Sequence, residues 1–169
     1  MRLPTRLLLL LPSLVACTSV STHRLLPATS PGPLRVGRVM AALDTDSIPA
    51  DRLSAARDYG TSTVLHGAVL ERLVEDRLFD ANSPATLKLT VTGFRLRSMA
   101  VVTWAGSVSG RDHLFVNAAL LDGKGQTVWN EAVNASSMRG SVIFGSESGR
   151  LENLARTTAG RVARDLRQR

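Results

Sequence analysis

Alternating hydrophobic and polar residues predict a strand over residues 85–97. Leu87, Leu89 and Val91 share one parity, and polar residues occupy the positions between them. The apolar phase then slips by one residue at Gly93. A β-bulge at this glycine would return the later apolar residues to the same face of the sheet.

A hairpin is predicted immediately downstream. Residues 114–121 and 127–135 have the composition of strands, and Asp-Gly-Lys-Gly at 122–125 joins them. Glycines supply the positive φ angles that tight turns require. Two further strands are predicted over residues 34–40 and 99–105.

Two amphipathic helices are predicted, over residues 61–78 and 150–167, with a short helical turn over 49–57. Thr61 or Ser62 could cap the first helix. Two rows of apolar residues at a spacing of four give this helix a broad apolar face: Leu65, Val69 and Leu73, and Leu70, Val74 and Leu78.

The order of elements predicts an α+β fold. We expect a mixed, mostly antiparallel sheet of four or five strands with two helices packed on one face. The first strand is followed by a helical crossover, so it could pair in parallel. Residues 34–169 are enough for a single domain with its own core.

The N-terminus has the pattern of an export signal. Arg2 and Arg6 precede an apolar stretch that begins with five leucines at 7–11 and is too short to span a bilayer. Residues 14–17 (Leu-Val-Ala-Cys) resemble the lipobox of bacterial lipoproteins. The resemblance implies cleavage before Cys17 and attachment of lipid to its sulfur. The alternative is an ordinary secretory signal with an incidental cysteine.

This resemblance divides the chain into three parts. Residues 1–16 are expected to be the signal peptide, 17–33 a flexible tether rich in Ser, Thr and Pro, and 34–169 a periplasmic domain. Two or more acyl chains on Cys17 would hold the protein stably in a membrane. Thr18 follows the cysteine, which resembles the sorting signal for the outer membrane.

Composition excludes several functions. Cys17 is the only cysteine, so the domain has no disulfide, thiolate metal site or cysteine nucleophile. The net charge is +7, but aromatic residues make up only 4% and no basic run is present. Nucleic acid is therefore not an expected partner. A basic surface near anionic lipid or polysaccharide fits an envelope protein better.

No catalytic motif, metal site or cofactor site is predicted, and we do not expect an enzyme. His23, His66 and His113 lack the spacing of metal ligands. Residues 106–110 and 145–149 have glycine at each end, but no serine stands at the central position of a nucleophile elbow. A small envelope hydrolase stays the alternative, and it would need a histidine close to a serine and an acid.

Apolar residues late in the chain are candidates for an interaction surface. Val142, Ile143 and Phe144 lie within a segment rich in glycine and serine, and Trp129 begins the second strand of the hairpin. An exposed apolar triad in a loop is unusual without a partner. The alternative for all four residues is packing in the core.

The combined features resemble a family of uncharacterised bacterial envelope lipoproteins. They are the lipobox, the Leu-x-Leu-x-Val-x-x-Phe segment at 87–94, the turn at 122–125 and the terminal amphipathic helix. The domain of that family is similar to the amino-terminal domain of TolB. The resemblance implies no catalytic residues and a periplasm-facing role in binding or assembly.

The resemblance is compatible with several roles. We expect the protein to bind an envelope protein or polymer. Alternatively, the protein is an auxiliary lipoprotein of a transport complex that binds lipid or lipopolysaccharide, or it is a structural spacer. The sequence leaves the oligomeric state open.

Overall fold

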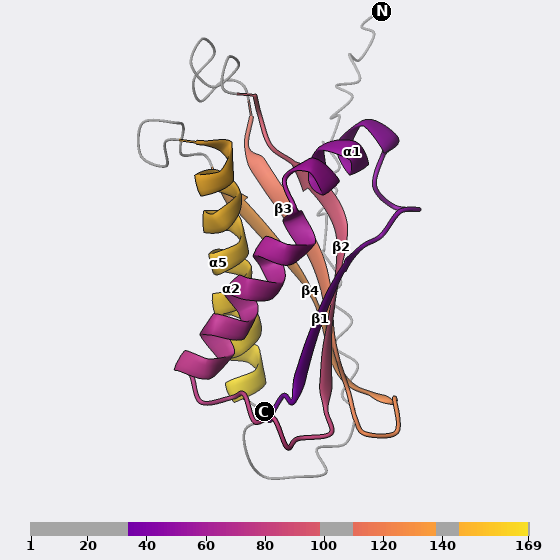
Figure 1. Cartoon of the computed structure of the whole chain (residues 1–169), viewed down its shortest axis with the longest axis vertical. Coiled ribbons are helices and arrows are strands. Elements are labelled where there is room, and N and C mark those ends of the chain that lie inside the picture. The colour runs from indigo at the N-terminus through magenta and orange to yellow at the C-terminus, as the bar shows by residue number, and fades with distance from the viewer. Residues whose placement is uncertain (1–33, 99–109, 138–145, 169) are drawn as a thin grey trace, which may run out of the picture.

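The computed structural model describes residues 34–98, 110–137 and 146–168, and these form a mixed sheet with helices on one side (Figure 1). The sheet has the order β1 (Arg38–Leu43), β2 (Thr86–Arg95), β3 (Asp112–Leu121) and β4 (Thr127–Ser137). The described helices are α1 (Ala50–Asp58), α2 (Thr61–Glu75) and α5 (Glu147–Arg167). The predicted α+β class is confirmed.

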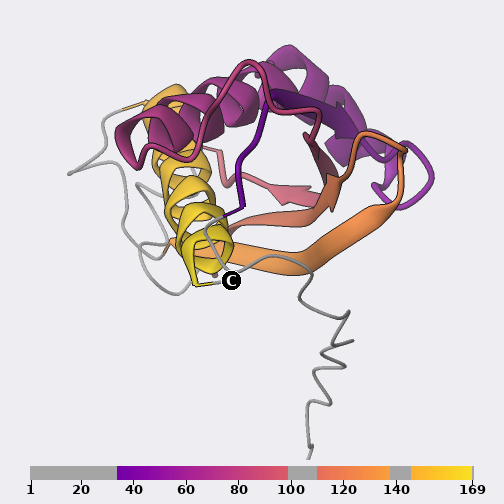
Figure 2. The same cartoon turned by 90° about the horizontal axis from the view of Figure 1, so that it is seen from below.

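One face of the sheet packs against α2 and α5. Helix α2 contacts β1 and α5, while α5 contacts β3 and β4. Figure 2 shows the sheet curving around these two helices. The shorter α1 lies at one end of the molecule and contacts β2 and α2 (Figure 1).

Strand β1 pairs in parallel with β2, and the other pairs are antiparallel, as predicted. The bounds predicted for β1 were wrong, because the strand runs from Arg38 to Leu43. Val36 instead makes an isolated bridge to Phe79. At Gly37 the chain passes so close to Ser83 that a Cβ atom would lie 1.8 Å from the Ser83 carbonyl oxygen.

The β-bulge predicted at Gly93 is confirmed. Val91 pairs with Val116 and Gly93 pairs with Phe115, so Thr92 is the extra residue. Phe94 consequently returns to the buried side of the sheet.

The predicted hairpin is also confirmed. Strands β3 and β4 are antiparallel neighbours. The Asp122 carboxylate accepts hydrogen bonds from the backbone N–H groups of Lys124 and Gln126, each at 2.8 Å. Gly125 closes the turn with a φ of +77°.

Helix α2 differs from the prediction at its ends. Gly60, in a left-handed conformation, is its N-cap, so the prediction of Thr61 or Ser62 was wrong. The helix stops at Glu75 because Arg77 adopts a φ of +56° and the Leu78 N–H bonds to the Leu73 carbonyl at 2.8 Å.

Only one of the two apolar rows predicted on this helix faces the core. Leu65, Val69 and Leu73 are fully buried. In the second row Val74 is 56% exposed, and Leu78 is buried only after the helix has ended.

Helix α5 begins at Glu147, three residues before the predicted start. The Ser146 hydroxyl accepts a hydrogen bond from the Gly149 N–H at 3.2 Å, which is a typical N-cap. Ala155, Ala159 and Ala163 are buried. Their small side chains let α5 lie close to its neighbours.

Several predicted features lie outside the described residues. These are Cys17 with the predicted signal and tether (1–33), the predicted strand at 99–105, and the triad Val142, Ile143 and Phe144. Within the described part of the chain, no helix has the length and apolarity needed to cross a bilayer.

The two glycines Gly37 and Gly67 should respond oppositely to alanine. Gly37→Ala should lower the free energy of unfolding by about 2–3 kcal/mol, because its Cβ would meet the Ser83 carbonyl. Gly67 lies in the interior of α2 with open space around it, so Gly67→Ala should raise stability by up to about 1 kcal/mol. Urea denaturation measures the free energy of unfolding of both variants. Equal stability of the two would contradict the close approach of Gly37 to the Ser83 carbonyl.

Candidate ligand-binding site

Of the four residues predicted for an interaction surface, only Trp129 lies among the described residues. Trp129 is only 4% exposed and belongs to the core, which is the alternative that the sequence left open. Its indole N–H has no hydrogen-bond partner in the described structure.

The two histidines of the folded domain do not form a hydrolytic site with described residues. His113 stacks on Phe115, with ring centroids 5.7 Å apart. Neither His66 nor His113 hydrogen-bonds a serine or a carboxylate in the described ranges. Within those ranges, no group of three His, Cys, Asp or Glu residues could hold a metal ion.

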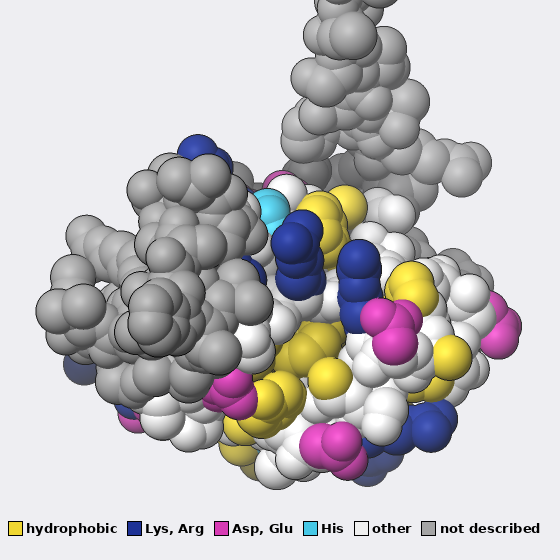
Figure 3. Space-filling model, turned by 90° about the horizontal axis from the view of Figure 1, so that it is seen from above, with side chains coloured by type: hydrophobic (Ala, Val, Ile, Leu, Met, Phe, Trp, Pro, Cys, Tyr) yellow, Lys and Arg dark blue, Asp and Glu magenta, His cyan; other side chains and the backbone are white. Residues whose placement is uncertain are grey.

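A pocket of about 330 Å³ lies where α1, the end of β2 and the start of α5 meet. Viewed from this end of the molecule, hydrophobic surface shows in a hollow between basic and acidic side chains (Figure 3). The lining combines apolar, aromatic and charged side chains: Asp51, Arg52, Ala55, Tyr59, Phe94, Arg95, Leu96, Ser98 and Glu147.

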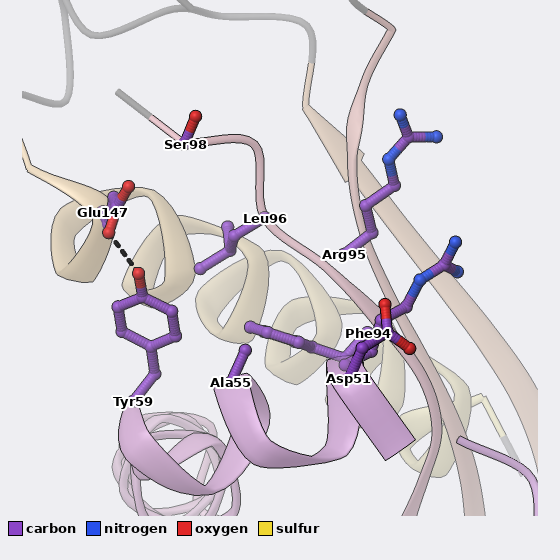
Figure 4. A pocket seen from close by; sticks show the side chains of 9 residues that line it. Asp51, Ala55, Tyr59, Phe94, Arg95, Leu96, Ser98 and Glu147 are labelled. Atoms are coloured by element: carbon purple, nitrogen blue, oxygen red, sulfur yellow. Dashed lines mark hydrogen bonds between the residues drawn. The ribbon is translucent and has the colours of Figure 1, made fainter. Parts of the chain in front are cut away.

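Tyr59 and Glu147 connect α1 and α5 across this pocket. Tyr59 is the C-cap of α1, and its hydroxyl donates a hydrogen bond to the Glu147 carboxylate in the first turn of α5 (Figure 4). This hydrogen bond raises the pKa of Tyr59 above its ordinary value, and partial burial and the charge of Glu147 act in the same direction. The phenol therefore stays protonated at neutral pH and donates its hydrogen to Glu147.

Three buried charged residues lie beside the pocket. Asp112 and Arg150 are fully buried and Arg97 is 4% exposed. The Asp112 carboxylate lies 3.1 Å from Arg97 Nε and 2.9 Å from Arg150 Nη1. We call Arg97, Asp112 and Arg150 the ion cluster.

The ion cluster ties three elements to one another. Arg97 donates its backbone N–H to Asp112 and one guanidinium N–H to the Gly110 carbonyl at 2.7 Å. Arg150, from α5, donates to the Arg97 carbonyl at 2.5 Å. The end of β2, the start of β3 and the first turn of α5 are thus held in one arrangement.

The ion cluster also reaches the pocket. Arg150 Nη2 lies 3.9 Å from Glu147 Oε1, and Glu147 accepts the hydroxyl of Tyr59. Polar contacts therefore run from the fully buried Asp112 to the pocket surface. In such surroundings each charged group is held firmly by its neighbours.

We did not predict the ion cluster from the sequence, although the pattern contained a signal. Asp112 is in phase with the inward-facing Leu114 and Val116 of β3. Arg150 precedes the buried Leu154 by four residues, one helical turn. A charged residue in phase with a buried row indicates a buried ion pair.

No family model and no curated protein matches this sequence. Among solved structures, the chain is similar to a PelC dodecamer from Paraburkholderia phytofirmans, with 17% identity, a TM-score of 0.49, and coverage of 83% of this chain and 96% of that chain.

Two further solved structures are similar to this chain. One is an uncharacterized protein, with 15% identity, a TM-score of 0.47, and coverage of 80% of this chain and 94% of the other. The second is a minor lipoprotein from Acinetobacter baumannii, with 14% identity, a TM-score of 0.36, and coverage of 78% and 90%. These likenesses assign no role to any residue.

Replacing the central carboxylate should destabilise the domain strongly. Asp112→Asn keeps the shape of the side chain but removes the negative charge that the two buried guanidiniums share. We expect the free energy of unfolding to fall by about 3–5 kcal/mol. Glu152→Gln removes the exposed pair with Arg156 and should change it by no more than about 0.5 kcal/mol. Similar losses in the two variants would contradict a structural role for the ion cluster.

The titration of Tyr59 tests the contact with Glu147. Tyr59 is the only tyrosine, so the absorbance of tyrosinate reports on this residue alone. Its pKa should lie above the ordinary value of 10.0, and Glu147→Gln should lower it. A raised pKa favours the protonated phenol in the folded state, so its stabilisation is complete below pH 10.0 and is lost as pH rises through the folded pKa. Glu152→Gln is the control and should leave the titration unchanged.

Proposed function

We propose that this protein is a lipid-anchored binding module of the bacterial envelope, not an enzyme. In this proposal Cys17 carries the lipid and the folded domain faces the periplasm from the outer membrane. The support is the lipobox-like sequence at 14–17 behind a basic, leucine-rich segment. The partner is an envelope protein or polymer.

The observation that carries the binding role is a pocket supported by the ion cluster. Ligand pockets combine apolar walls with a few firmly placed polar groups. Here Phe94, Leu96 and Ala55 supply apolar surface, and Tyr59 and Glu147 are fixed by their mutual hydrogen bond. Buried charges are expensive, and retaining them beside a pocket favours a site of fixed shape.

The lining favours binding over catalysis. Tyr59 stays protonated and is occupied with Glu147, so it offers no base to a substrate. The remaining charged lining residues are Asp51, Arg52 and Arg95. They suit recognition of a charged or polar ligand.

A lipid or lipopolysaccharide ligand of a transport complex is the second candidate. The lining favours it, because the guanidiniums of Arg52 and Arg95 could bind a phosphate while the apolar wall accepts an acyl chain. Figure 4 shows the guanidinium of Arg95 pointing away from the Tyr59–Glu147 pair, toward the outside of the pocket.

Site-specific crosslinking in living cells tests the proposal. A photo-reactive phenylalanine analogue replaces Ala55, which lines the pocket, or Ser54, its exposed neighbour on the same helix. We expect a discrete adduct from position 55 and none from position 54. Mass spectrometry identifies the adduct as protein, polymer or lipid.

The same experiment with Cys17→Ala tests the anchor. We expect the parent chain to be acylated and to stay with the membrane fraction, and the variant to be released from it. No adduct from position 55 in the anchored chain would reject the pocket as the binding site. An unmodified Cys17 would reject the anchor.

A further inference from the structure

The sheet has a second face, which points away from α2 and α5 (Figure 2). We call it the open face. Its outward positions include Arg38 in β1 and Lys88 and Arg95 in β2, each exposed next to a buried neighbour. Arg111, just before β3, is exposed and continues the outward alternation of His113 and Phe115.

Acidic residues are missing from the described outward positions of this face. The chain has 14 Asp and Glu residues, yet none occupies an outward position within the four described strands. Asp44 lies just beyond the end of β1. Its carboxylate accepts hydrogen bonds from the Ser47 hydroxyl and from the backbone of Asp46 and Ser47, which lower its pKa.

The basic residues on the two sides of the molecule differ in part in their partners. On the helical side Arg72, Arg156 and Arg167 form ion pairs with carboxylates, whereas Arg57 and Arg164 form none with described residues. In the described residues, no ion pair or hydrogen bond occupies the side chains of Arg38, Lys88, Arg95 and Arg111. Their field is therefore not neutralised locally and attracts anions.

Exposed apolar side chains lie among these cations. Met40 is 52% exposed, Phe115 41% and Val128 39%. Phe115 lies across Gly93, where a Cβ atom would be 2.8 Å from its ring. Basic residues interspersed with exposed apolar ones are typical of proteins that bind a membrane surface.

The cations are spread along the face. Arg38 pairs with Thr86 near one end, and Arg95 pairs with His113 near the other. Lys88 and Arg95 are seven residues apart on β2, a distance of about 20 Å along a strand. Charges at this spacing suit an extended anionic surface better than a small ligand.

We propose that the open face docks on an anionic phospholipid bilayer, the membrane in which Cys17 is anchored. The inference rests on the proposed function for the presence of the anchor. The predicted tether at 17–33 leads to Leu34, which precedes β1 at the edge of the open face. A flexible chain of that length has an end-to-end distance of about 20–25 Å. The anchor thus keeps the open face within reach of the bilayer, so weak attractions suffice.

Vesicle sedimentation tests this docking with the full chain carrying Cys17→Ala, which cannot be acylated. The vesicles contain phosphatidylcholine alone or mixed with phosphatidylglycerol. We expect stronger partitioning into the mixed vesicles and weaker partitioning as salt is added. Residues 1–16 are common to all variants, so only differences between variants are interpreted.

Two double variants with the same loss of charge separate the open face from net charge. Arg38→Gln/Lys88→Gln should lower the partition coefficient into the mixed vesicles about 25-fold, since each cation contributes about fivefold. Arg57→Gln/Arg164→Gln removes exposed cations from α1 and α5 and should lower it less than about threefold. Circular dichroism confirms that both variants are folded.

Other outcomes would overturn the inference. Equal losses in the two double variants would mean that net charge, and not the open face, drives binding. Equal partitioning into both kinds of vesicle would exclude recognition of anionic lipid. Binding of alginate that depends on Arg38 and Lys88, without binding to the mixed vesicles, would assign the face to an anionic polysaccharide. None of these results bears on crosslinking at position 55, so the proposed function is tested separately.

Discussion

The ion pairs of the Asp112 carboxylate, buried between Arg97 and Arg150, are the interactions on which the pocket end of this molecule depends. Removing three charges from water is costly, and such clusters contribute little net stability compared with well-packed apolar residues. Their effect is to select one arrangement. Here the selected arrangement sets the first turn of α5 against the ends of β2 and β3, which places Glu147 opposite Tyr59. The pocket follows from that placement.

Features set by neighbouring residues were predictable from the sequence. The turn at 122–125 and the bulge at Gly93 depend on local glycines and on alternation within one strand. The ends of strands and helices were harder to predict where a contact with a residue distant in the sequence determined them. The start of β1 is displaced because Gly37 passes the Ser83 carbonyl, and 46 residues of sequence separate the two.

The candidate site could not be predicted in the same way, because its parts come from distant segments. Tyr59 and Glu147 are 88 residues apart, and Arg97 and Arg150 are 53 apart. Motif searches look for catalytic residues at short, fixed spacings, and this site has none. The phase of Asp112 with Leu114 was visible, but phase shows only that a charge is buried. It does not identify the partner that neutralises it.

The two surfaces of the domain are linked by one residue. Arg95 closes β2, so its backbone belongs to the strand end that the ion cluster holds, while its exposed guanidinium belongs both to the pocket lining and to the open face. The Arg95 guanidinium would attract a phosphate in the pocket and a phosphate at the open face. It cannot form a full set of hydrogen bonds with both at once. If the open face docks on lipid as proposed, that contact would compete with an anionic ligand in the pocket for this guanidinium. A ligand held by the apolar wall of Phe94 and Leu96 would not depend on that guanidinium and so would not compete.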